Sequence, residues 1–403
     1  MKKKIYLDYA ATTPVSSEVF KAMKPYFSHD YGNPSEPHSW GQKTRAAIDK
    51  AREQVAVFLG AQPQEIIFTS GATEAINLAH KGLVESRKKA DFLPHIITSS
   101  IEHKAVLETC LHLEKLKMAE VTYLPVNENG LVQIVDLEKA IKLNTILVSI
   151  IYVNNETGVI QPIAEIGEKL KKINIERQVL GQSKVYFHTD ATQAIQYFNC
   201  QVDSLGVDCL SLSGHKFYAP KGVGVLYLRK GISLTRQQDG GGQEYRLRAG
   251  TENVPFIVAL GQALEIVGKQ NPEINKVMEK LRDQLIAGVL QIKSTQLIGA
   301  GAKRSPHIAS FLIDGAEGEA MLLLLSEKGI AVSSGSACTS GLLEPSHVLR
   351  AMGILPEKAH GSLRFSLGNQ TKEEEIKEVI KVLPEVISSL RRMAPDLSDF
   401  KLK

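Results

Sequence analysis

Lys216 is the residue of this sequence whose possible chemistry is clearest from its neighbours. It follows an apolar, strand-like run that begins at Cys209, and it ends the segment SGHK at 213–216, before a turn rich in glycine and proline. A lysine at the end of a buried strand, beside small residues that can contact a phosphate, is what a Schiff-base enzyme needs. The alternative is a surface lysine that follows a buried strand, and the segment alone does not decide between the two.

Pyridoxal phosphate (PLP) is the cofactor that such a lysine would serve, and its other requirements can be sought elsewhere in the chain. The segment SGATE at 70–74 ends a strand-like run and opens a helical one, so its free N–H groups suit a phosphate. Asp190 ends another such run and suits the pyridine nitrogen, with Gln193 three residues later as a donor to the ring oxygen. The alternatives are ordinary helix starts, capped by Thr73 and by Asp190.

Further polar residues stand where strand-like runs give way to loops. His103 is a candidate for stacking on the ring and handling protons, and Asn155 follows another run in the same way. Ser213 and His215, next to Lys216, add side-chain donors for a phosphate. Each residue alone is more commonly structural, but compatible residues at five strand ends favour one PLP site.

Cys338 differs from the other cysteines in its surroundings. It lies in SSGSACTSG at 333–341, a run of small residues with two glycines and no apolar anchor, which predicts a mobile loop and suits a nucleophilic thiol. Cys110 in a helical run and Cys209 in a strand-like run are expected to be small buried hydrophobes, with Cys200 in a loop. No cysteine pair has disulfide or zinc spacing, which favours a reducing compartment.

The elements that must position these residues follow an alternating pattern between about residues 65 and 230. Strands are expected at 65–70, 95–100, 120–126, 145–153, 184–189, 207–212 and 224–229, and helices at 72–85, 103–118, 135–142 and 163–173. Alternation of this kind predicts an α/β fold with a mostly parallel sheet covered by helices, whose ligands bind at the carboxyl ends of the strands.

The pattern changes in the last third of the chain. A long helix is expected at 256–292, followed by strands at 307–313, 329–333 and 362–367 and helices at 318–327 and 372–393. We therefore expect a large domain over 15–262 and a smaller α+β domain made of 1–14 and 263–403, which would carry the Cys338 segment and Arg364.

Composition narrows the function classes. The 403 residues are 43% hydrophobic and 23% charged, with a net charge of +4, which is too small and too scattered to indicate nucleic-acid binding. The basic start at 1–4 is followed by only three apolar residues, so neither a signal peptide nor a membrane span is expected. The cytoplasm is the expected location.

Taken together, these segments resemble the cysteine desulfurases of the NifS/IscS type, PLP enzymes of fold type I. The resemblance covers almost the whole chain in order: YLDYAATTP at 6–14, GNPS at 32–35, SGATE at 70–74, EHKAV at 102–106, VNNE at 153–156, DATQ at 190–193, SGHK at 213–216, RAGT at 248–251, SSGSACTS at 333–340 and SLRFSLG at 362–368. Two stretches depart from it: 174–183, which we expect to be a surface insertion, and 398–403, which carries no recognised motif.

The resemblance implies a role for each matching residue. Lys216 would bind the cofactor covalently, and Cys338 would take the sulfur of L-cysteine as a persulfide and release L-alanine. Arg364 and Asn155 would hold the substrate, and no intrinsic metal is implied, with Cys338 at most a transient ligand of a cluster. The implied cofactor contacts are Ala72, Thr73, Ser213 and His215 to the phosphate, Asp190 to the pyridinium, Gln193 and Asn155 to the ring oxygen, and His103 to the ring face.

The resemblance also implies partners. Family members are homodimers, in which Thr251 would reach the cofactor phosphate of the partner subunit, and they pass sulfur to an acceptor protein. Iron–sulfur cluster assembly, tRNA thiolation and cofactor synthesis stay open as destinations. The competing interpretations are a selenocysteine lyase or aminotransferase on the same fold, which the Cys338 segment disfavours, and a non-catalytic relative, which the intact set of site residues disfavours.

Overall fold

The protein is built around a seven-stranded sheet in the order β2-β8-β7-β6-β5-β3-β4. The computed structural model describes residues 4–89, 91–334 and 345–393. The strands are β2 (Ile66–Thr69), β3 (His95–Ser99), β4 (Glu120–Leu124), β5 (Thr145–Ser149), β6 (Tyr186–Asp190), β7 (Cys209–Ser213) and β8 (Gly224–Leu228). Only β8 runs against its neighbours β2 and β7, so the expected mostly parallel sheet is confirmed.

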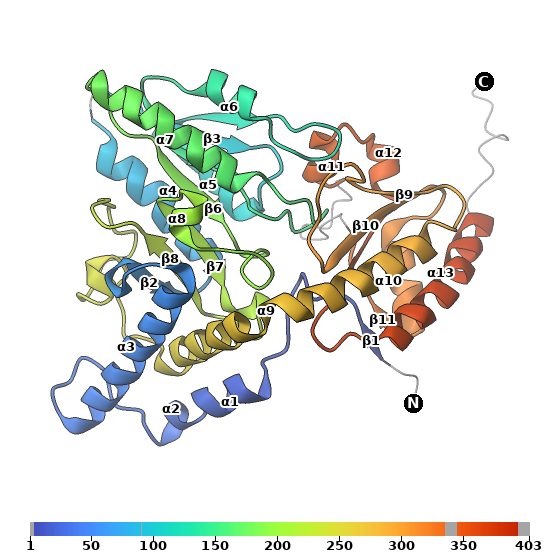
Figure 1. Ribbon diagram of the computed structural model, residues 1–403, viewed down its shortest axis with the longest axis horizontal. Helices are drawn as coiled ribbons and strands as arrows, with labels where there is room; N and C mark the ends of the chain where they lie inside the picture. Colours follow the sequence, from blue (N-terminus) through green and yellow to red (C-terminus); the bar gives the residue numbers. More distant parts are fainter. Residues whose placement is uncertain (1–3, 90, 335–344, 394–403) are drawn as a thin grey trace.

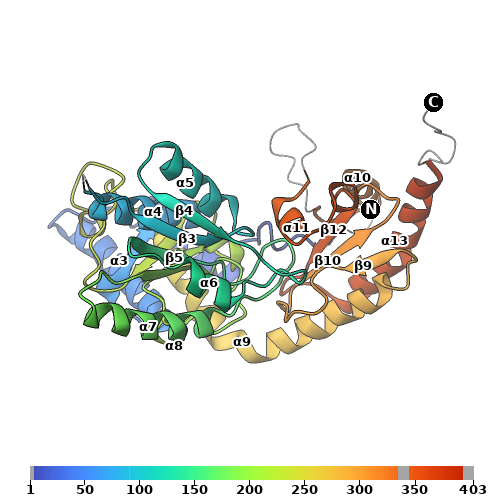
Figure 2. The same ribbon diagram turned by 90° about the horizontal axis from the view of Figure 1, so that it is seen from above.

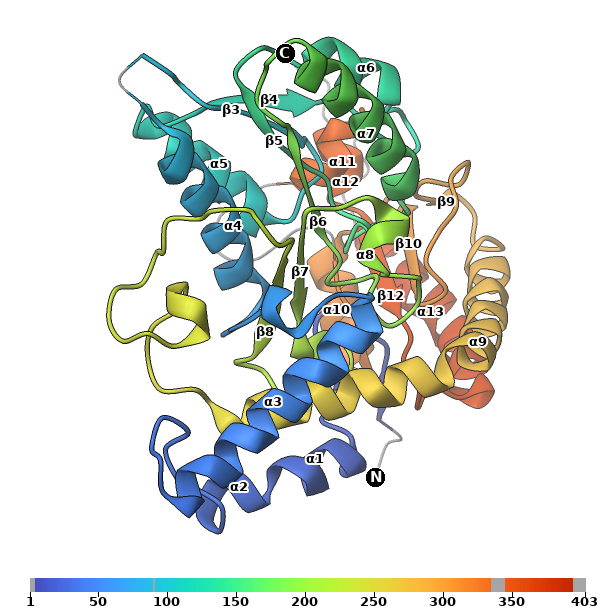
Figure 3. The same cartoon turned by 60° about the vertical axis from the view of Figure 1, so that its left-hand side comes forward.

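Helices cover both faces of this sheet (Figure 3). One face packs against α4 (Ala72–Arg87) and α5 (Lys104–Lys115), whose apolar residues recur at helical spacing and are buried with Ile96, Leu147 and Leu226 of the sheet. The other face packs against α3 (Ser39–Leu59), α7 (Ile163–Val179) and the first half of α9 (Val254–Val289). The smaller helices of this part are α1 (Ser17–Met23), α2 (Pro25–Ser28), α6 (Ile134–Ala140) and α8 (Val202–Leu205).

A second, smaller body holds its own core (Figure 2). Its antiparallel sheet has the order β12-β10-β9, and the short strand β1 (Ile5–Tyr6) pairs with β11 (Ile330–Ala331). The other elements are β9 (Thr295–Leu297), β10 (Ile308–Ile313), β12 (Ser362–Ser366), α10 (Gly318–Glu327), α11 (His347–Ala351), α12 (Pro356–Ala359) and α13 (Glu373–Met393). Helix α9 runs along both bodies and connects them (Figures 1 and 2).

The structure differs from the sequence analysis at three places. Helix α7 extends to Val179, beyond its expected end at 173, and Arg177 on its last turn donates to the carbonyls of Lys142 and Leu143, which fixes the helix against the loop before β5. Helix α4 begins at Ala72 after Gly71, so Thr73 lies inside its first turn and does not cap it. The helices before residue 60 were not predicted.

The N-terminal segment passes between the two bodies. After β1, residues 8–13 leave the small body beside β12 and reach the loop that follows β7, where Thr13 N–H donates to the carbonyl of His215. We call residues 8–13 the N-terminal strap. No helix within the described residues is long and apolar enough to cross a membrane.

Candidate active site

The carboxyl ends of five strands meet at one cavity of about 580 Å³, a size typical of small-molecule sites. Ten of the residues singled out in the sequence line it: Ala72, Thr73, His103, Asn155, Asp190, Gln193, Ser213, His215, Lys216 and Arg364. Wider hollows of about 900 Å³ beside α7 and about 700 Å³ between α3 and α9 contain none of them. The sheet therefore gathers the predicted chemistry at one place.

Lys216 ends the short 3₁₀ turn Gly214–Lys216 that follows β7. Its Nζ donates to the carbonyl oxygens of Ala10 at 2.6 Å and Ala11 at 2.8 Å, both in the N-terminal strap. Burial, reinforced by the charge of Arg364, lowers the pKa of this amine from 10.5 to about 8, although Asp8 and Asp190 oppose the shift. About half of Lys216 is therefore neutral and nucleophilic at pH 8, and about a tenth at pH 7.

The N-terminus of α4 offers a site for an anion. Its first-turn N–H groups have no intrahelical acceptor, and no side chain caps them. Gly224 lets this turn come close to β8, because a Cβ there would lie 2.6 Å from the backbone of Gly71. Ser213 and His215 face the same cavity, and His215 is neutral at pH 7, because burial and then the Lys216 charge lower its pKa to about 4.

Asp190, the last residue of β6, is buried at the centre of this strand edge. Its Oδ1 accepts from the backbone N–H of Thr192 at 2.9 Å, a local turn rather than a helix cap. Gln193 donates from Nε2 to the carbonyl of Ala10 at 2.8 Å and accepts at Oε1 from His307 at 3.2 Å. The Gln193 amide is thus held in place by protein groups on both sides.

His103 stands at the start of α5 beside an unusual carboxyl group. Its Nδ1 accepts from the N–H of Ala105, which puts the ring proton on Nε2, and burial lowers its pKa. The neighbouring Glu102 is fully buried, and burial raises its pKa to about 8, so this carboxyl is protonated at neutral pH. Glu102 Oε1 accepts from Ser99 at 2.5 Å and from Ile151 N–H at 2.9 Å, which ties the ends of β3 and β5 together.

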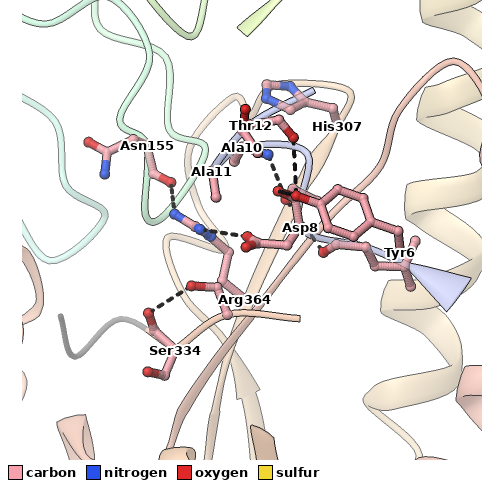
Figure 4. Close-up of polar contacts among 12 residues, drawn as sticks. Tyr6, Asp8, Ala10, Ala11, Thr12, Asn155, His307, Ser334 and Arg364 are labelled. Carbon is pink, nitrogen blue, oxygen red and sulfur yellow. Dashed lines mark hydrogen bonds and ion pairs between the residues drawn. The ribbon is translucent and has the colours of Figure 1, made fainter. Parts of the chain in front are cut away.

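Arg364, on β12, enters the cavity from the small body (Figure 4). Its guanidinium donates to Asp8 Oδ1 at 2.9 Å and to the backbone carbonyl of Asn155 at 2.7 Å. The Nε–H of Arg364 is buried without a partner among the described residues. Figure 4 shows the Asn155 side-chain amide directed away from Arg364, so the backbone makes this contact.

Of the two remaining candidate residues, Thr251 is among the described residues and Cys338 is not. Thr251 is exposed and does not line the cavity within this chain. Cys338 lies outside the described residues, although both flanks of its segment are described. Before the segment, Ser333 exchanges backbone hydrogen bonds with Arg364, and after it, Ser346 donates to the half-buried carboxyl of Glu156.

The residues present fit the cofactor that the sequence predicts. The cavity offers an amine, a carboxylate, a helix N-terminus for a phosphate and a guanidinium for a carboxylate. It also holds two buried polar atoms that lack a partner among the described residues, Thr192 Oγ1 and Arg364 Nε, as expected where a polar ligand binds.

Sequence reasoning missed the contribution of the N-terminal strap. Ala10, Ala11 and Asp8 contact Lys216, Gln193 and Arg364, yet the segment received no role beyond its match to the family. It also missed the buried Glu102. The sequence feature that could have revealed both is the set of polar residues in YLDYAATTP and EHKAV, which neither helix nor strand periodicity explains.

Comparison with known proteins places the chain in a family. Residues 5–379 match the family "Aminotransferase class-V". "Cysteine desulfurase IscS" of Methanosarcina thermophila is 48% identical over 98% of this chain and 94% of that protein. A solved "NIFS-LIKE PROTEIN" has a TM-score of 0.88 and 39% identity, covering 96% of this chain and 100% of that one.

A second solved structure, "SspA in complex with cysteine", has a TM-score of 0.77 and 39% identity, covering 91% of this chain and 99% of that one. The match to the family and to its cysteine desulfurases runs from β1 to α13 and includes both bodies of the fold. The chain therefore belongs to the PLP-dependent class-V aminotransferase family, in its cysteine desulfurase branch.

Proposed function

We propose that the protein is a cysteine desulfurase that converts L-cysteine to L-alanine and keeps the sulfur on Cys338 as a persulfide. The observation that carries this proposal is the shared cavity of Lys216 and Arg364, an amine of lowered pKa together with a guanidinium that has a free donor. One group suits an amino acid's Cα proton and the other suits its carboxylate.

PLP, when bound, supplies the electron sink that stabilises charge developing at the substrate's Cα. Ala72, Thr73, Ser213 and His215 would hold its phosphate, Asp190 its pyridinium, and Gln193 and Asn155 its ring oxygen, with His103 at the ring face. Lys216 Nζ would bind the cofactor and then move the Cα proton, since its amine is partly neutral near pH 8. His103, with the proton on Nε2, would serve as the second proton-handling group.

Sulfur transfer would then be carried out by Cys338. Its thiolate attacks the substrate sulfur, so the S–S bond of the persulfide forms while the Cβ–S bond of cysteine breaks. The electron pair and a proton pass to the carbon skeleton, which leaves as alanine, and no outside oxidant is needed. The flank at Ser333 supports this role, because its backbone pairs with the substrate-binding Arg364.

The test is to incubate the holoenzyme with L-cysteine in the absence of reductant and to map its peptides by mass spectrometry. An extra sulfur is expected on the peptide that contains Cys338. Sulfur on Cys110, Cys200 or Cys209 would overturn the assignment. These three thiols are buried, and burial raises the pKa of each well above its ordinary value.

The competing activities on the same fold have distinct products. An aminotransferase would release a keto acid, and a selenocysteine lyase would prefer the selenium substrate. The curated relatives named cysteine desulfurase favour neither. Alanine formed in equal amount to persulfide, without keto acid, is the expected result.

We also propose that the protein works as a homodimer that delivers sulfur to an acceptor protein. Support for a dimer comes from the exposed Thr251, which would reach the partner's cofactor phosphate, and from aromatic side chains exposed on neighbouring elements of one edge: Phe20, Phe27, Tyr31 and Trp40. The acceptor would be an iron–sulfur scaffold or a thiolation enzyme. Capture by the persulfide form of the enzyme, with untreated enzyme as control, identifies it.

The proposed division into a large domain over 15–262 and a small domain made of 1–14 and 263–403 is supported by the separation of the buried clusters on the two faces of the large sheet from the main cluster of the small body. A cytoplasmic location is supported by the described cysteines, Cys110, Cys200 and Cys209, which are free thiols.

A further inference from the structure

We propose that Asp8 is a positioning residue for the substrate: it fixes the orientation of the Arg364 guanidinium, which lines the cavity. The inference rests on the proposed role of Arg364 in binding the substrate carboxylate. Asp8 belongs to the N-terminal strap, 356 residues away from Arg364 in the sequence, and their side chains meet at 2.9 Å (Figure 4).

The backbone around Asp8 is held on both sides by strands of the small body. Leu7 donates to the carbonyl of Ala331 at 2.8 Å and accepts from Ser366 N–H at 2.8 Å. Ala10 N–H donates to the hydroxyl of Ser366, also at 2.8 Å. Asp8 therefore presents its carboxylate from a fixed position, and Ser366 lies on the same strand as Arg364, two residues further on.

The donors of Arg364 divide into two groups. A guanidinium has five N–H groups in a planar fork. One is used by Asp8 and one by the carbonyl of Asn155, whereas Nε–H is buried without a partner among the described residues. With the fork pinned at its two terminal nitrogens, its orientation about the side-chain axis is set, and its other N–H groups are left to bind a carboxylate.

Asp8 and Asn155 constrain the fork in different ways. Asn155 belongs to the loop after β5 on the large sheet, so its contact with Arg364 depends on how the two bodies lie against each other. Asp8 is anchored to the same small sheet as Arg364, so the contact between these two residues is independent of how the two bodies lie. Asp8 is thus the contact that can hold the direction of Arg364 independently of the Asn155 loop.

A simpler reading is that Asp8 only balances the charge of Arg364. The side chain of Arg364 is 9% exposed and that of Asp8 is 21% exposed, so charge balance is a real need at this site. The two readings separate on replacement by asparagine. An amide oxygen still accepts the hydrogen bond from Arg364 but carries no charge, whereas alanine removes both the charge and the acceptor.

The experiment compares two amines that differ only by a carboxylate. L-Alanine and ethylamine are titrated into the holoenzyme, and the change in the cofactor's absorption band gives an apparent Kd for each. The Kd ratio of ethylamine to L-alanine reports carboxylate recognition without turnover. The variants are Asp8→Ala, Asp8→Asn and the control Asp203→Asn, which alters a more exposed Asp–Arg pair of the same length, 2.9 Å, on α8 and outside the lining of this cavity.

Asp8→Ala is expected to lower the ratio at least tenfold, because the variant should bind L-alanine more weakly. Its Kd for ethylamine should stay within twofold of the wild-type value, which would show that the site is intact. Asp8→Asn and Asp203→Asn should keep the ratio within threefold. In turnover, Asp8→Ala should raise KM for L-cysteine far more than it lowers kcat. If Asp8→Ala does not retain the cofactor, Asp8→Ser replaces it, because a serine side chain is too short to reach Arg364.

Two results would overturn the proposal: an Asp8→Ala ratio within twofold of wild type, or an Asp8→Asn ratio as low as that of Asp8→Ala, since charge alone would then explain the effect. Arg364→Lys separates this from the proposed function. A point charge cannot replace the fork, so the Kd ratio of ethylamine to L-alanine should fall in that variant as well. If it does not, the carboxylate is bound elsewhere and the assignment of Arg364 itself is wrong.

Discussion

The Nζ atom of Lys216 lies 2.6 Å from the carbonyl oxygen of Ala10, although 206 residues separate the two in the sequence. The contact brings the N-terminal strap into the site, where it also accepts from Gln193 and reaches Arg364. Lys216 is thus enclosed, and this enclosure is the source of its low pKa. The first prediction follows from that value.

Cofactor uptake by the apoprotein should accelerate with rising pH, reach half of its maximum rate at about pH 8 and level off above about pH 9. The neutral amine is the attacking form, and its fraction rises as pH passes through the pKa of Lys216, lowered by burial from 10.5 to about 8. Stopped-flow absorbance at pH 6.5 to 10.5 measures the rate. A rate that keeps rising up to pH 10.5 would contradict the lowered pKa.

Lys216→Ala should leave a folded protein that binds PLP without a covalent bond and does not turn over. Removal of a covalent catalyst costs several orders of magnitude in rate. Borohydride reduction followed by peptide mapping should place the cofactor on Lys216 in the wild type and on no peptide in the variant. Lys221, which lines the same cavity, is the internal control, and label on it in the wild type would contradict the assignment.

Asp190→Asn should lower kcat by at least tenfold and the PLP content by much less. The amide keeps the turn with Thr192, so the strand end stays in place, but it no longer favours the protonated pyridine nitrogen. Bound PLP is measured by absorbance after denaturation and turnover by alanine release. An unchanged kcat would exclude the pairing of Asp190 with the ring.

Glu244→Gln should lower the free energy of unfolding by about 3 kcal/mol, because it leaves Arg52 charged and buried. Arg52 and Glu244 are about 5% and 6% exposed and share two hydrogen bonds at 2.8 and 2.7 Å. Their pairing holds a turn in which Glu244, Tyr245 and Arg246 all have positive φ angles, ahead of the Thr251 segment.

The matched control is Asp239→Asn, which alters the exposed pair of Arg236 and Asp239 on the same loop and should change stability by less than about 0.5 kcal/mol. Urea unfolding of both variants measures the difference. Equal effects would mean that the buried pair does not anchor the turn.

His80→Gln should make the protein less sensitive to acid. Burial lowers the pKa of His80 from 6.5 to about 4, so its contribution to stability is complete above pH 6.5 and is lost as pH falls towards 4. Between pH 6.5 and 4, His80 makes the free energy of unfolding fall by up to about 1.4 kcal/mol more for each pH unit. Urea midpoints at pH 7, 5.5 and 4.5, with the exposed His112→Gln as control, should reveal a flatter dependence for His80→Gln alone.

The sequence alone was sufficient to single out ten residues that line one cavity in the structure. Asp190, Lys216, His103 and Asn155 each follow a strand-like run, and the carboxyl ends of parallel strands meet at one edge of a sheet whatever the lengths of their connections. Alternating patterns are local, so the strands and helices between residues 65 and 230 could be found from short windows. For the same reason α10, at Gly318–Glu327, was predicted with its bounds.

The tertiary structure decided the contacts between residues that are far apart in the sequence, which no short window contains. The contacts of Asp8 with Arg364 and of Ala10 with Lys216 join segments hundreds of residues apart, and they depend on how two bodies and a strap pack together. The end of α7 depended on Arg177 reaching a neighbouring loop. Residue type and spacing thus determined which groups could do chemistry, whereas long-range packing determined their charge states, their partners and the direction in which they face, because burial and pairing are properties of the folded chain.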